Sequence, residues 1–533
     1  MPATRPLAGL LALAFVTLLI GGAFAGLLSE AARDWSGAAA AFDPYLLRIV
    51  RFTLWQAALS TVLSVAPAIL VARALSRHPA FPGRGAILGL FAVPLGLPAI
   101  VVAMGVLALL GRAGWFAPAL AWLSGGDWPG IYGLSGILVA HVFFNLPLAA
   151  RLLLEALDAV PRDHWRLAVQ LGMGAGASFR LIEWPALRAV LPGAAALVFM
   201  LCVTSFTIVL MLGGGPAATT LEVAIYQALR FDFDSARAVT LTAAQIVLTV
   251  AAVATMSRLG ASPTGEASLA VSARRHAQAG PAETALNAAL IVIAVLFVTG
   301  PMVAIVGAGI EADLLRLAGE ASVQHAAVTS LGLATLAAVL SAALSLALVA
   351  ARRRLEAARR GGRMGLLEWA ADNGALFVLV VPPIVIGAGW FVLLRHAGSV
   401  FAAAPAMVVS VNAVMAMPFA IRAIRPAYDA GSVRHDRLAA QLGMSGWTRL
   451  RLVDWPVLRR PLLTALAFSM ALSLGDLGVI ALFGSENVKT LPYLLLERMG
   501  AYRTRDAAGL ALFLGLLCLA LMTLAGRLGR ERA

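Results

Sequence analysis

Long apolar runs recur along the whole sequence, and each is close to the roughly 20 residues that an α-helix needs to cross a bilayer. Helices are favoured over strands because an open sheet edge leaves backbone groups unpaired in lipid. Charged residues make up only 13% of the sequence, against roughly 25% in a soluble domain. We therefore predict an all-α, polytopic membrane protein with about 12 transmembrane helices, at 7–28, 49–72, 86–110, 133–157, 188–212, 238–257, 285–309, 326–350, 371–394, 404–424, 460–483 and 506–527.

The first apolar run, Leu7 to Leu28, allows two interpretations. Arg5 precedes it and Ala23-Phe24-Ala25 resembles a signal-peptidase site, as in a cleaved signal peptide. The run is longer, however, than the roughly 7–15 apolar residues that are usual in signal peptides. We therefore expect residues 1–30 to be retained as a first transmembrane helix.

One polar segment occurs twice at a constant spacing. Residues 164–188 reappear as residues 435–459 without a gap, and 14 of the 25 positions are identical. Pro147 ahead of the first copy also recurs as Pro418 ahead of the second. The sequence therefore predicts two homologous halves.

The distribution of arginine predicts the orientation of these halves. With the N-terminus inside, 29 of the 41 Arg and Lys side chains lie on the cytoplasmic face, as the positive-inside rule requires. Both copies of the repeated segment are then cytoplasmic, so the halves are parallel repeats with both termini inside. The net charge of +14 is spread over several juxtamembrane segments, which is typical of membrane-facing loops and argues against nucleic-acid binding.

The domain organisation follows from the repeat and the apolar runs. A stretch rich in Gly, Ala, Ser and Arg separates the halves and is typical of a flexible linker. The expected segments are a first transmembrane helix at 1–30, a first transmembrane domain at 47–258, a cytoplasmic linker at 259–284, a seventh helix with an outer loop at 285–325, a second transmembrane domain at 326–527 and a cytoplasmic tail at 528–533.

Each repeated segment has the composition of a compact helical loop. Asp158 to Val169 can form a short helix, Gly172 allows a turn, and a second short helix carries Phe179 to Ile182. Trp184-Pro185 then leads back into the membrane, since tryptophan favours the interface and proline suits the first turn of a helix. Two such loops on one face would suit two copies of a soluble partner.

The repeated loops resemble the cytoplasmic signature of the type I permease subunits of binding-protein-dependent ABC importers. That signature is E-A-A, followed by L-G and later by a proline that leads into a helix. Here the segments 166–172 (RLAVQLG) and 437–443 (RLAAQLG) keep the second alanine and the glycine, while Arg and Leu replace the Glu and the first Ala. The resemblance implies an ATPase-docking role for Arg166, Ala168, Gln170, Gly172, Arg437, Ala439, Gln441 and Gly443.

The resemblance also implies the partners. Two copies of an ATP-binding subunit would dock on the cytoplasmic side of a bacterial inner-membrane permease, and a periplasmic binding protein would deliver the substrate. The sequence contains no G-x-x-x-x-G-K-[ST] motif, so ATP is expected to bind the partner subunit. We therefore expect a transport subunit that is not itself an enzyme and that holds no cofactor, metal or catalytic residue.

The stretch from Ser473 to Leu510 resembles the thiamine and thiamine pyrophosphate permeases within that family. Its Gly-Asp-Leu-Gly, Leu-Phe-Gly, Thr-Leu-Pro-Tyr and Met-Gly-Ala-Tyr-Arg-Thr series carry the resemblance. Fused ferric-iron permeases share the layout and stay an alternative, and so does an ion-coupled secondary carrier. The sequence does not distinguish thiamine from its phosphate esters.

One carboxylate lies deep in an apolar run. Asp476 follows Arg460 by 16 residues, which places it roughly 24 Å from the cytoplasmic end of a helix. A carboxylate at that depth is costly unless it is paired or faces water. Two roles for Asp476 are equally compatible with the sequence. It could lie beside a path for a cationic thiazolium ring, or it could bond to an adjacent helix or to Arg498, Arg503 or Arg505. The candidate substrate path comprises Asp476, Ser473, Ser205 and Thr204.

The remaining polar residues fit less specific roles. His141 is expected to be a packed core histidine, and Cys202 and Cys518 are expected to pack inside apolar runs. Two sets of outer-loop charges are candidates for binding-protein contacts, although solvated faces are favoured: Glu486, Lys489, Glu497 and Arg498, and Glu222, Asp232 and Asp234.

Overall fold

A computed structural model describes residues 7–258 and 280–529, except 360–361, 375–377, 379–380, 397, 399 and 445. Most of the linker expected at 259–284, and most of the tail expected at 528–533, lie outside the described residues. Within the described residues the secondary structure is helical, apart from an isolated bridge between Ser485 and Val488. The all-α fold predicted from the apolar runs is confirmed.

The chain forms two compact units. The first-half unit comprises Pro44–Val223 with Val247–Ala308, and the second-half unit comprises Met1–Asp43, Ala224–Ile246 and Gly309–Ala533. Each unit therefore contains the leading helix of the opposite half: α1 (Leu7–Arg33) belongs to the second-half unit, and most of α14 (Pro281–Ile310) belongs to the first.

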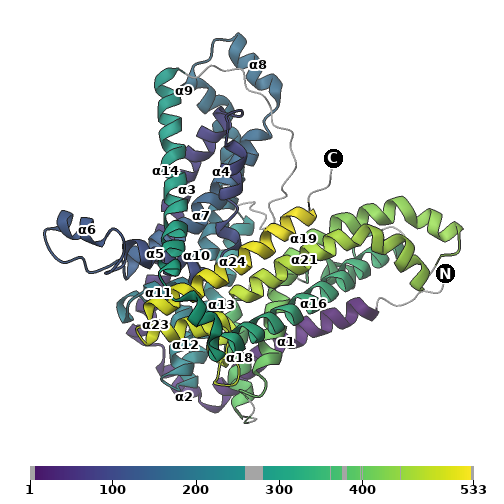
Figure 1. Ribbon diagram of the computed structural model, residues 1–533. Coiled ribbons are helices and arrows are strands. Elements are labelled where there is room, and N and C mark those ends of the chain that lie inside the picture. Colours follow the sequence, from purple (N-terminus) through teal and green to yellow (C-terminus); the bar gives the residue numbers. More distant parts are fainter. Residues whose placement is uncertain are drawn as a thin grey trace. The chain divides into compact units, whose positions relative to one another are not determined.

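The first-half unit is built around α3, which packs against α7 and α10 (Figure 1). The short helices α8 and α9 lie together at one end of these long helices (Figure 1). The helices of this unit, besides α14, are α3 (Pro44–Arg77), α4 (Arg84–Leu90), η1 (Pro94–Gly96), α5 (Ala99–Leu110), α6 (Ala117–Ser124), α7 (Leu134–Asp158), α8 (Arg162–Gln170), α9 (Ala175–Ser178), η2 (Phe179–Glu183), α10 (Trp184–Val203), α11 (Thr207–Leu212) and η3 (Pro216–Ala218).

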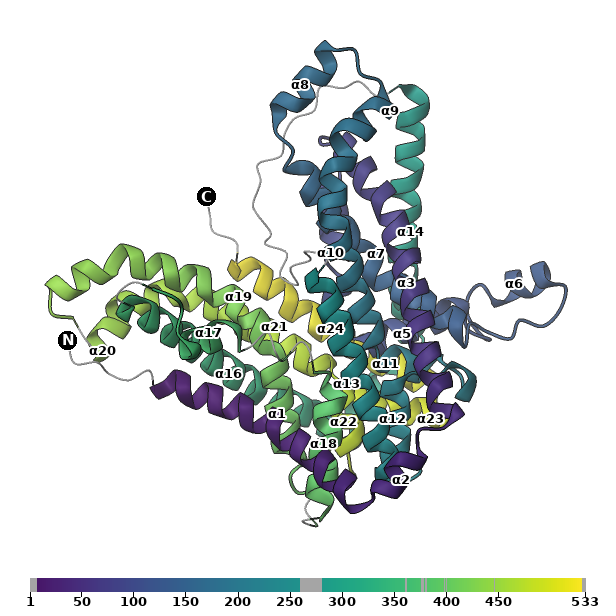
Figure 2. The same ribbon diagram turned by 180° about the vertical axis from the view of Figure 1, so that it is seen from behind.

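The second-half unit repeats this core with α16, α19 and α21, and α20 lies at the far end of the α19–α21 pair (Figure 2). Its helices, besides α1, are α2 (Trp35–Ala40), α15 (Leu314–Gly319), α16 (Ala321–Ala358), α17 (Leu366–Asn373), α18 (Pro383–His396), α19 (Ala404–Gln441), α20 (Gly446–Arg449), η5 (Leu450–Asp454), α21 (Trp455–Gly475), α22 (Gly478–Phe483), α23 (Leu491–Gly500) and α24 (Thr504–Gly529). The helices α12 (Leu221–Arg230) and α13 (Ser235–Arg258) run from one unit into the other along the chain.

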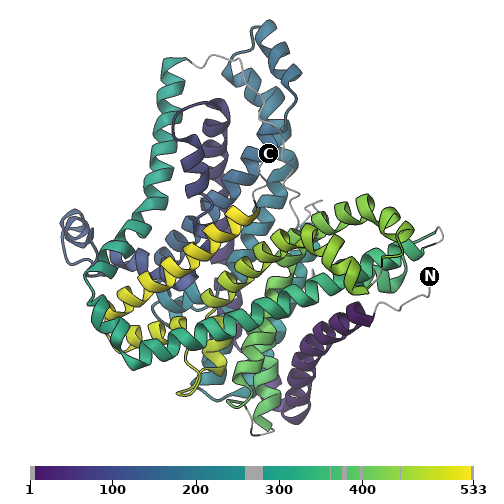
Figure 3. The same cartoon turned by 45° about the vertical axis from the view of Figure 1, so that its right-hand side comes forward.

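The leading helix α1 packs tightly in the second-half unit, beside α16 and α18 (Figure 3). The indole Nε1 of Trp390 donates a hydrogen bond of 2.7 Å to the carbonyl of Leu19. A Cβ added to Gly26 would lie 2.2 Å from the carbonyl oxygen of Gly389, so glycine permits this close approach of the two backbones. A residue with any side chain at Gly26 would separate the helices.

Ten helices among the described residues are long and apolar enough to cross a membrane. The number is smaller than the twelve predicted. Residues 84–110 form two helices that meet at an angle of 111°, and 371–394 yields the shorter helix Pro383–His396. Pro98 explains the first difference, because proline lacks an N–H and disfavours a helical residue before it.

Two further predicted spans are interrupted at equivalent places. The span expected at 188–212 ends at Val203 and resumes at Thr207, and the span expected at 460–483 ends at Gly475 and resumes at Gly478. In the second half Asp476 bonds to the backbone N–H groups of Gly478 and Val479, which favours a break over a continuous helix. In the first half the hydroxyl of Ser205 bonds to His141 instead. Hydropathy alone could not reveal these breaks.

A shared hydrogen bond marks the structural symmetry of the halves. The hydroxyl of Thr53 accepts from the backbone N–H of Leu221 at 3.1 Å, and the hydroxyl of Ser330 accepts from that of Leu491 at 2.7 Å. Each bond satisfies an N–H in the first turn of a short helix, α12 or α23, that has no partner inside the helix. The two halves therefore hold corresponding short helices in the same way.

Candidate functional site

The first repeated loop ends its helix α8 with a left-handed glycine. Gly172 has φ +64°, and its N–H donates to the carbonyl of Val169 at 3.1 Å. The N–H of Met173 donates to the carbonyl of Ala168 at 2.9 Å. This pair of bonds is the Schellman motif, which reverses the chain where only glycine avoids backbone strain.

The second repeated loop has the same turn at the end of α19. Gly443 has φ +64°, its N–H donates to Ala440 at 3.2 Å, and the N–H of Met444 donates to Ala439 at 2.9 Å. The turn predicted at Gly172 is therefore confirmed and occurs in both halves. Beyond the adjacent residues, no atom of the part of the chain that the structure describes lies within 4 Å of a Cβ added at either glycine, so the positive φ is what requires glycine.

Each loop buries its alanine and exposes leucines. Ala168 and Ala439 are 4% and 2% exposed, whereas Leu167 and Leu438 are 53% and 54% exposed. The pattern continues one helical turn on, at a spacing that places two leucines on one face. Leu171 and Leu442 are exposed, as are the polar docking candidates Arg166, Gln170, Arg437 and Gln441. The two leucines of each loop therefore form one exposed apolar face on an otherwise polar helix.

The first loop is anchored to α3 by a buried carboxylate. Glu183 is completely buried and accepts hydrogen bonds from Arg73 at 2.7 Å and Arg77 at 3.0 Å. Arg77 also donates to the carbonyl of Ala175 at 3.3 Å, and Arg73 lies over the ring of Phe179. The two arginines of α3 therefore contact both short helices of this loop, α9 and η2.

The second loop is anchored mainly within itself. Arg449 contacts Asp436 at 2.6 Å and Asp454 at 3.5 Å. The helix α19 runs without a break into this loop, whereas Pro161 separates α7 from α8 in the first half. Proline disfavours a helical conformation at the residue before it, which explains the separate helix in the first copy.

The first half holds a buried polar cluster near its helix break. His141 is buried, and its two ring nitrogens lie 2.9 Å from the hydroxyls of Ser60 and Ser205. The packed histidine predicted from the sequence is confirmed. Thr204 does not join this cluster, because its hydroxyl donates back to the carbonyl of Met200 at 2.9 Å. Ser205 is thus the one predicted path residue of this half in the cluster.

The second half places Asn412 where the first half has His141. Asn412 donates to the hydroxyl of Ser473 at 3.0 Å and also bonds the carboxylate of Asp476. Asp476 accepts from the backbone N–H groups of Gly478 and Val479, so it helps to begin α22. Sequence reasoning missed Asn412 as a cluster member, although the 271-residue spacing that pairs it with His141 carried the signal.

Two of the three arginines suggested as partners of Asp476 pair elsewhere. Arg498 contacts Glu320 and Asp506, and Arg503 contacts Asp506. The alternative of a bond to an adjacent helix is therefore confirmed by Asn412 of α19, and backbone capping takes the place of pairing with Arg498 or Arg503. Among the residues that the structure describes, no group of three or more His, Cys, Asp and Glu side chains could hold a metal ion.

The expectation for Glu222 was wrong. Its side chain is 1% exposed, so it forms neither a solvated face nor a binding-protein contact in this structure. Lys489 lies between Glu486 at 3.0 Å and Glu497 at 3.2 Å. Burial opposes the charge on Lys489, but the hydrogen bonds and charges of these two glutamates outweigh it and raise the pKa of Lys489.

Both halves of the chain match the model of one protein family. The model of the binding-protein-dependent transport system inner membrane component matches residues 64–261 and 357–530, once in each half. The chain belongs to this family. The resemblance inferred from the repeated loops is confirmed, and the two matches support a multi-pass inner-membrane permease built from two homologous halves.

Two thiamine transport permeases match this chain almost end to end, and a molybdenum transport permease matches about a third of it. It is 56% identical over 532 residues to the thiamine transport system permease protein ThiP of Brucella abortus (strain 2308), which spans 100% of the chain and 96% of the relative. It is 42% identical over 487 residues to ThiP of Escherichia coli (strain K12), spanning 91% of the chain and 90% of the relative. The molybdenum transport system permease ModB of Azotobacter vinelandii is 32% identical over 179 residues, 34% of the chain and 78% of that protein.

Interrupted helices do not separate this permease from a secondary carrier. Carriers commonly have such interruptions. The structure has breaks near Pro98, Ser205 and Asp476. Family membership, and not helix continuity, therefore excludes the carrier alternative.

Proposed function

We propose that this chain is the membrane permease of an ATP-driven thiamine importer. Its 56% identity over the whole chain to a thiamine transport permease carries the proposal. A separate ATPase would supply the energy and a periplasmic protein would deliver the substrate. Thiamine carries a cationic thiazolium ring, and Asp476 offers a carboxylate at the second-half helix break.

Two features support docking of one ATPase subunit on each repeated loop. The Schellman turns give both loops the same shape, and equivalent leucines are exposed on each. Two copies of one protein bind two copies of one surface most simply when the surfaces are related by a twofold axis. Closure of the ATPase pair would then move the two halves, and rocking of the halves would alternate access to the substrate.

The orientation can be tested with single cysteines. Cys202 and Cys518 are buried and can be replaced by alanine, after which Arg166→Cys and Arg437→Cys are introduced one at a time. An impermeant maleimide should label both only after the inner membrane is opened. Leu315→Cys on α15, which is 89% exposed, should be labelled in intact spheroplasts. Labelling of either repeated loop from outside would refute the proposed topology.

The substrate can be tested by uptake. A deletion strain that carries this chain with its ATPase and binding protein should accumulate labelled thiamine and should not accumulate ferric iron. Excess unlabelled thiamine pyrophosphate is added as a competitor, and lower uptake of labelled thiamine would show that the importer also binds the ester. ATP-independent accumulation driven by a proton gradient would contradict the proposed mechanism.

Asp476→Asn should lower the rate of thiamine uptake about tenfold, which corresponds to a loss of about 1.4 kcal/mol. The change removes the negative charge, while asparagine still accepts hydrogen bonds at a helix start. Ser205→Ala at the equivalent position of the first half removes no charge and should have a smaller effect. Equal uptake by Asp476→Asn and the parent protein would show that the charge does not act on the substrate.

A further inference from the structure

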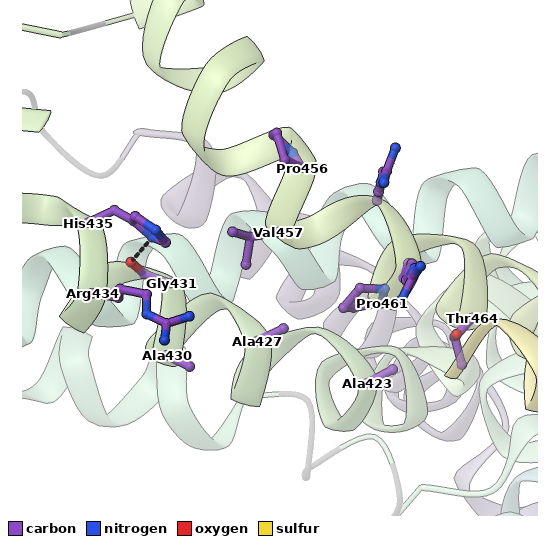
Figure 4. Close-up of a pocket in the computed structure, with 12 residues that line it drawn as sticks. Ala423, Ala427, Ala430, Gly431, Arg434, His435, Pro456, Val457, Pro461 and Thr464 are labelled. Carbon is purple, nitrogen blue, oxygen red and sulfur yellow. Dashed lines mark hydrogen bonds between the residues drawn. The ribbon is translucent and has the colours of Figure 1, made fainter. Parts of the chain in front are cut away.

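A basic pocket of about 770 Å³ lies between α19 and α21 of the second-half unit (Figure 4). Its lining on α19 extends from Ala423 to His435, a distance of about 18 Å along the helix. On α21 it extends from Pro456 to Thr464. The volume is in the range of ligand sites in proteins.

Basic side chains provide all the charge of this pocket. Arg434, Arg459 and Arg460 line it together with His435, and no carboxylate is among the lining residues. The nearby carboxylates Asp436 and Asp454 contact Arg449 instead. No ion pair joins Arg434, Arg459 or Arg460 to a carboxylate within the part of the chain that the structure describes. The pocket therefore has three guanidinium groups available for an anion.

The two ends of the pocket differ in polarity. Arg434 and His435 lie toward the end of α19 that leads into the repeated loop, and Nδ1 of His435 donates to the carbonyl of Gly431 (Figure 4). Ala423 and Thr464 lie at the opposite end, toward the apolar middles of both helices (Figure 4). The buried hydroxyl of Thr464 has no hydrogen-bond partner among the described residues. A ligand that fills this pocket is thus an anion with a less polar part.

Gly431 keeps the pocket open. A Cβ at this position would lie 3.0 Å from a methyl group of Val457, which is closer than most real contacts. At the 271-residue spacing, the first half has Val160 in place of Gly431, Asp163 in place of Arg434 and Ala189 in place of Arg460. The repeat therefore keeps the docking turn in both halves, whereas the first half lacks the glycine and two of the three arginines that line this pocket.

We propose that this pocket binds the phosphate headgroup of an anionic phospholipid from the cytoplasmic leaflet. Basic pockets between transmembrane helices on the cytoplasmic side suit such headgroups, and arginine binds phosphate oxygens in a forked geometry. The alanines along α19 leave room for the glycerol and the start of an acyl chain. The inference rests on the cytoplasmic placement proposed above for this end of α19.

Lipid binding can be measured on the purified full-length chain, without transport. The protein in neutral detergent is titrated with dioleoylphosphatidylglycerol, and bound lipid is counted by native mass spectrometry. Dioleoylphosphatidylcholine serves as the zwitterionic lipid with the same chains, and inorganic phosphate serves as the soluble anion. The test variant is Arg434→Gln/Arg459→Gln/Arg460→Gln, and all three side chains are exposed. The control, Arg162→Gln/Arg180→Gln/Arg188→Gln, removes three exposed arginines from the first-half loop.

The parent protein should bind phosphatidylglycerol in preference to phosphatidylcholine, and the test variant should bind it about tenfold more weakly, while the control stays within about twofold. Gly431→Val should also weaken binding without changing the net charge. The proposal is overturned if the test variant binds like the parent protein, if the control loses as much affinity, or if millimolar phosphate displaces the lipid. Normal lipid binding with loss of the ATPase in the test variant would assign the pocket to ATPase docking instead.

Discussion

Leu167→Asp/Leu438→Asp is expected to abolish thiamine uptake and to weaken ATPase binding at least about a hundredfold. Each leucine is half exposed and is not needed to hold the loop together. Burial of a leucine in a partner groove contributes about 1.5–3 kcal/mol. Aspartate loses that contribution at both loops and adds a charge that the partner must desolvate. Two measurements check the prediction: pull-down of the tagged double variant for ATPase retention, and vesicle uptake for transport.

The matched control for this variant is Leu315→Asp. Leu315 is a more exposed leucine on α15, outside the repeated loops, so the same change there should leave ATPase retention unchanged. Each leucine should contribute, since two copies of the partner are proposed to bind. A double variant that still retains the ATPase would show that the exposed leucines face solvent in the assembled importer.

Changes to the shared turn should have the same outcome by another route. Gly443→Pro removes the N–H that donates to Ala440, and proline cannot adopt φ +64°. Ala439→Asp places a carboxylate where the side chain is 2% exposed. Both variants should insert into the membrane normally but lose uptake. If the ATPase co-purifies with both, the docking role of the loop is wrong.

Most of the fold could be predicted from the apolar runs and from the internal repeat. An apolar run of about 20 residues has few alternatives to a membrane helix, because lipid leaves the backbone no partner outside the helix. The turn at Gly172 and Gly443 was predictable because the glycine recurs at an equivalent place and a left-handed position favours glycine. These inferences needed only local chemistry.

The helix breaks and the partners of buried polar groups were less accessible to sequence reasoning. Asp476 interrupts an apolar run by bonding to the backbone of the next helix, and hydropathy does not register a hydrogen bond. The burial of Glu222 depends on what packs around α12. The packing of α1 in the second-half unit could not be predicted either, because the sequence of an apolar helix does not indicate which half it packs against.

The anchor of the first loop also depends on residues that the sequence separates widely. Arg73 and Arg77 lie 110 and 106 positions before Glu183 in the sequence. Their spacing of four residues on α3 places both guanidinium groups on one helical face, where they share a single carboxylate. Among the described residues, the equivalent loop of the second half has no such pair of arginines on one carboxylate. The two loops therefore share their Schellman turns but differ in how they are anchored.

Glu183→Gln should destabilise the first-half unit by about 3 kcal/mol, because it leaves two arginines without their buried partner. Arg77 retains Glu283 as a partner, whereas Arg73 lies 4.0 Å from that carboxylate. We expect the melting temperature in detergent, followed by tryptophan fluorescence, to fall by at least about 5 °C. Asp454→Asn at the equivalent position should have a smaller effect, since Asp454 is partly exposed and contacts Arg449 only at 3.5 Å.

The double variant Arg73→Met/Glu183→Met separates the loss of a charge from the loss of contact. Methionine fills a similar volume without a charge, and replacement of a buried ion pair by apolar side chains is often neutral or stabilising. Its melting temperature should therefore exceed that of Glu183→Gln, with Arg77 still paired to Glu283. If the double variant melts at the lower temperature instead, the anchor acts through hydrogen-bond geometry and not through charge balance. Equal melting of Glu183→Gln and Asp454→Asn would show that the buried anchor contributes no more stability than its partly exposed counterpart.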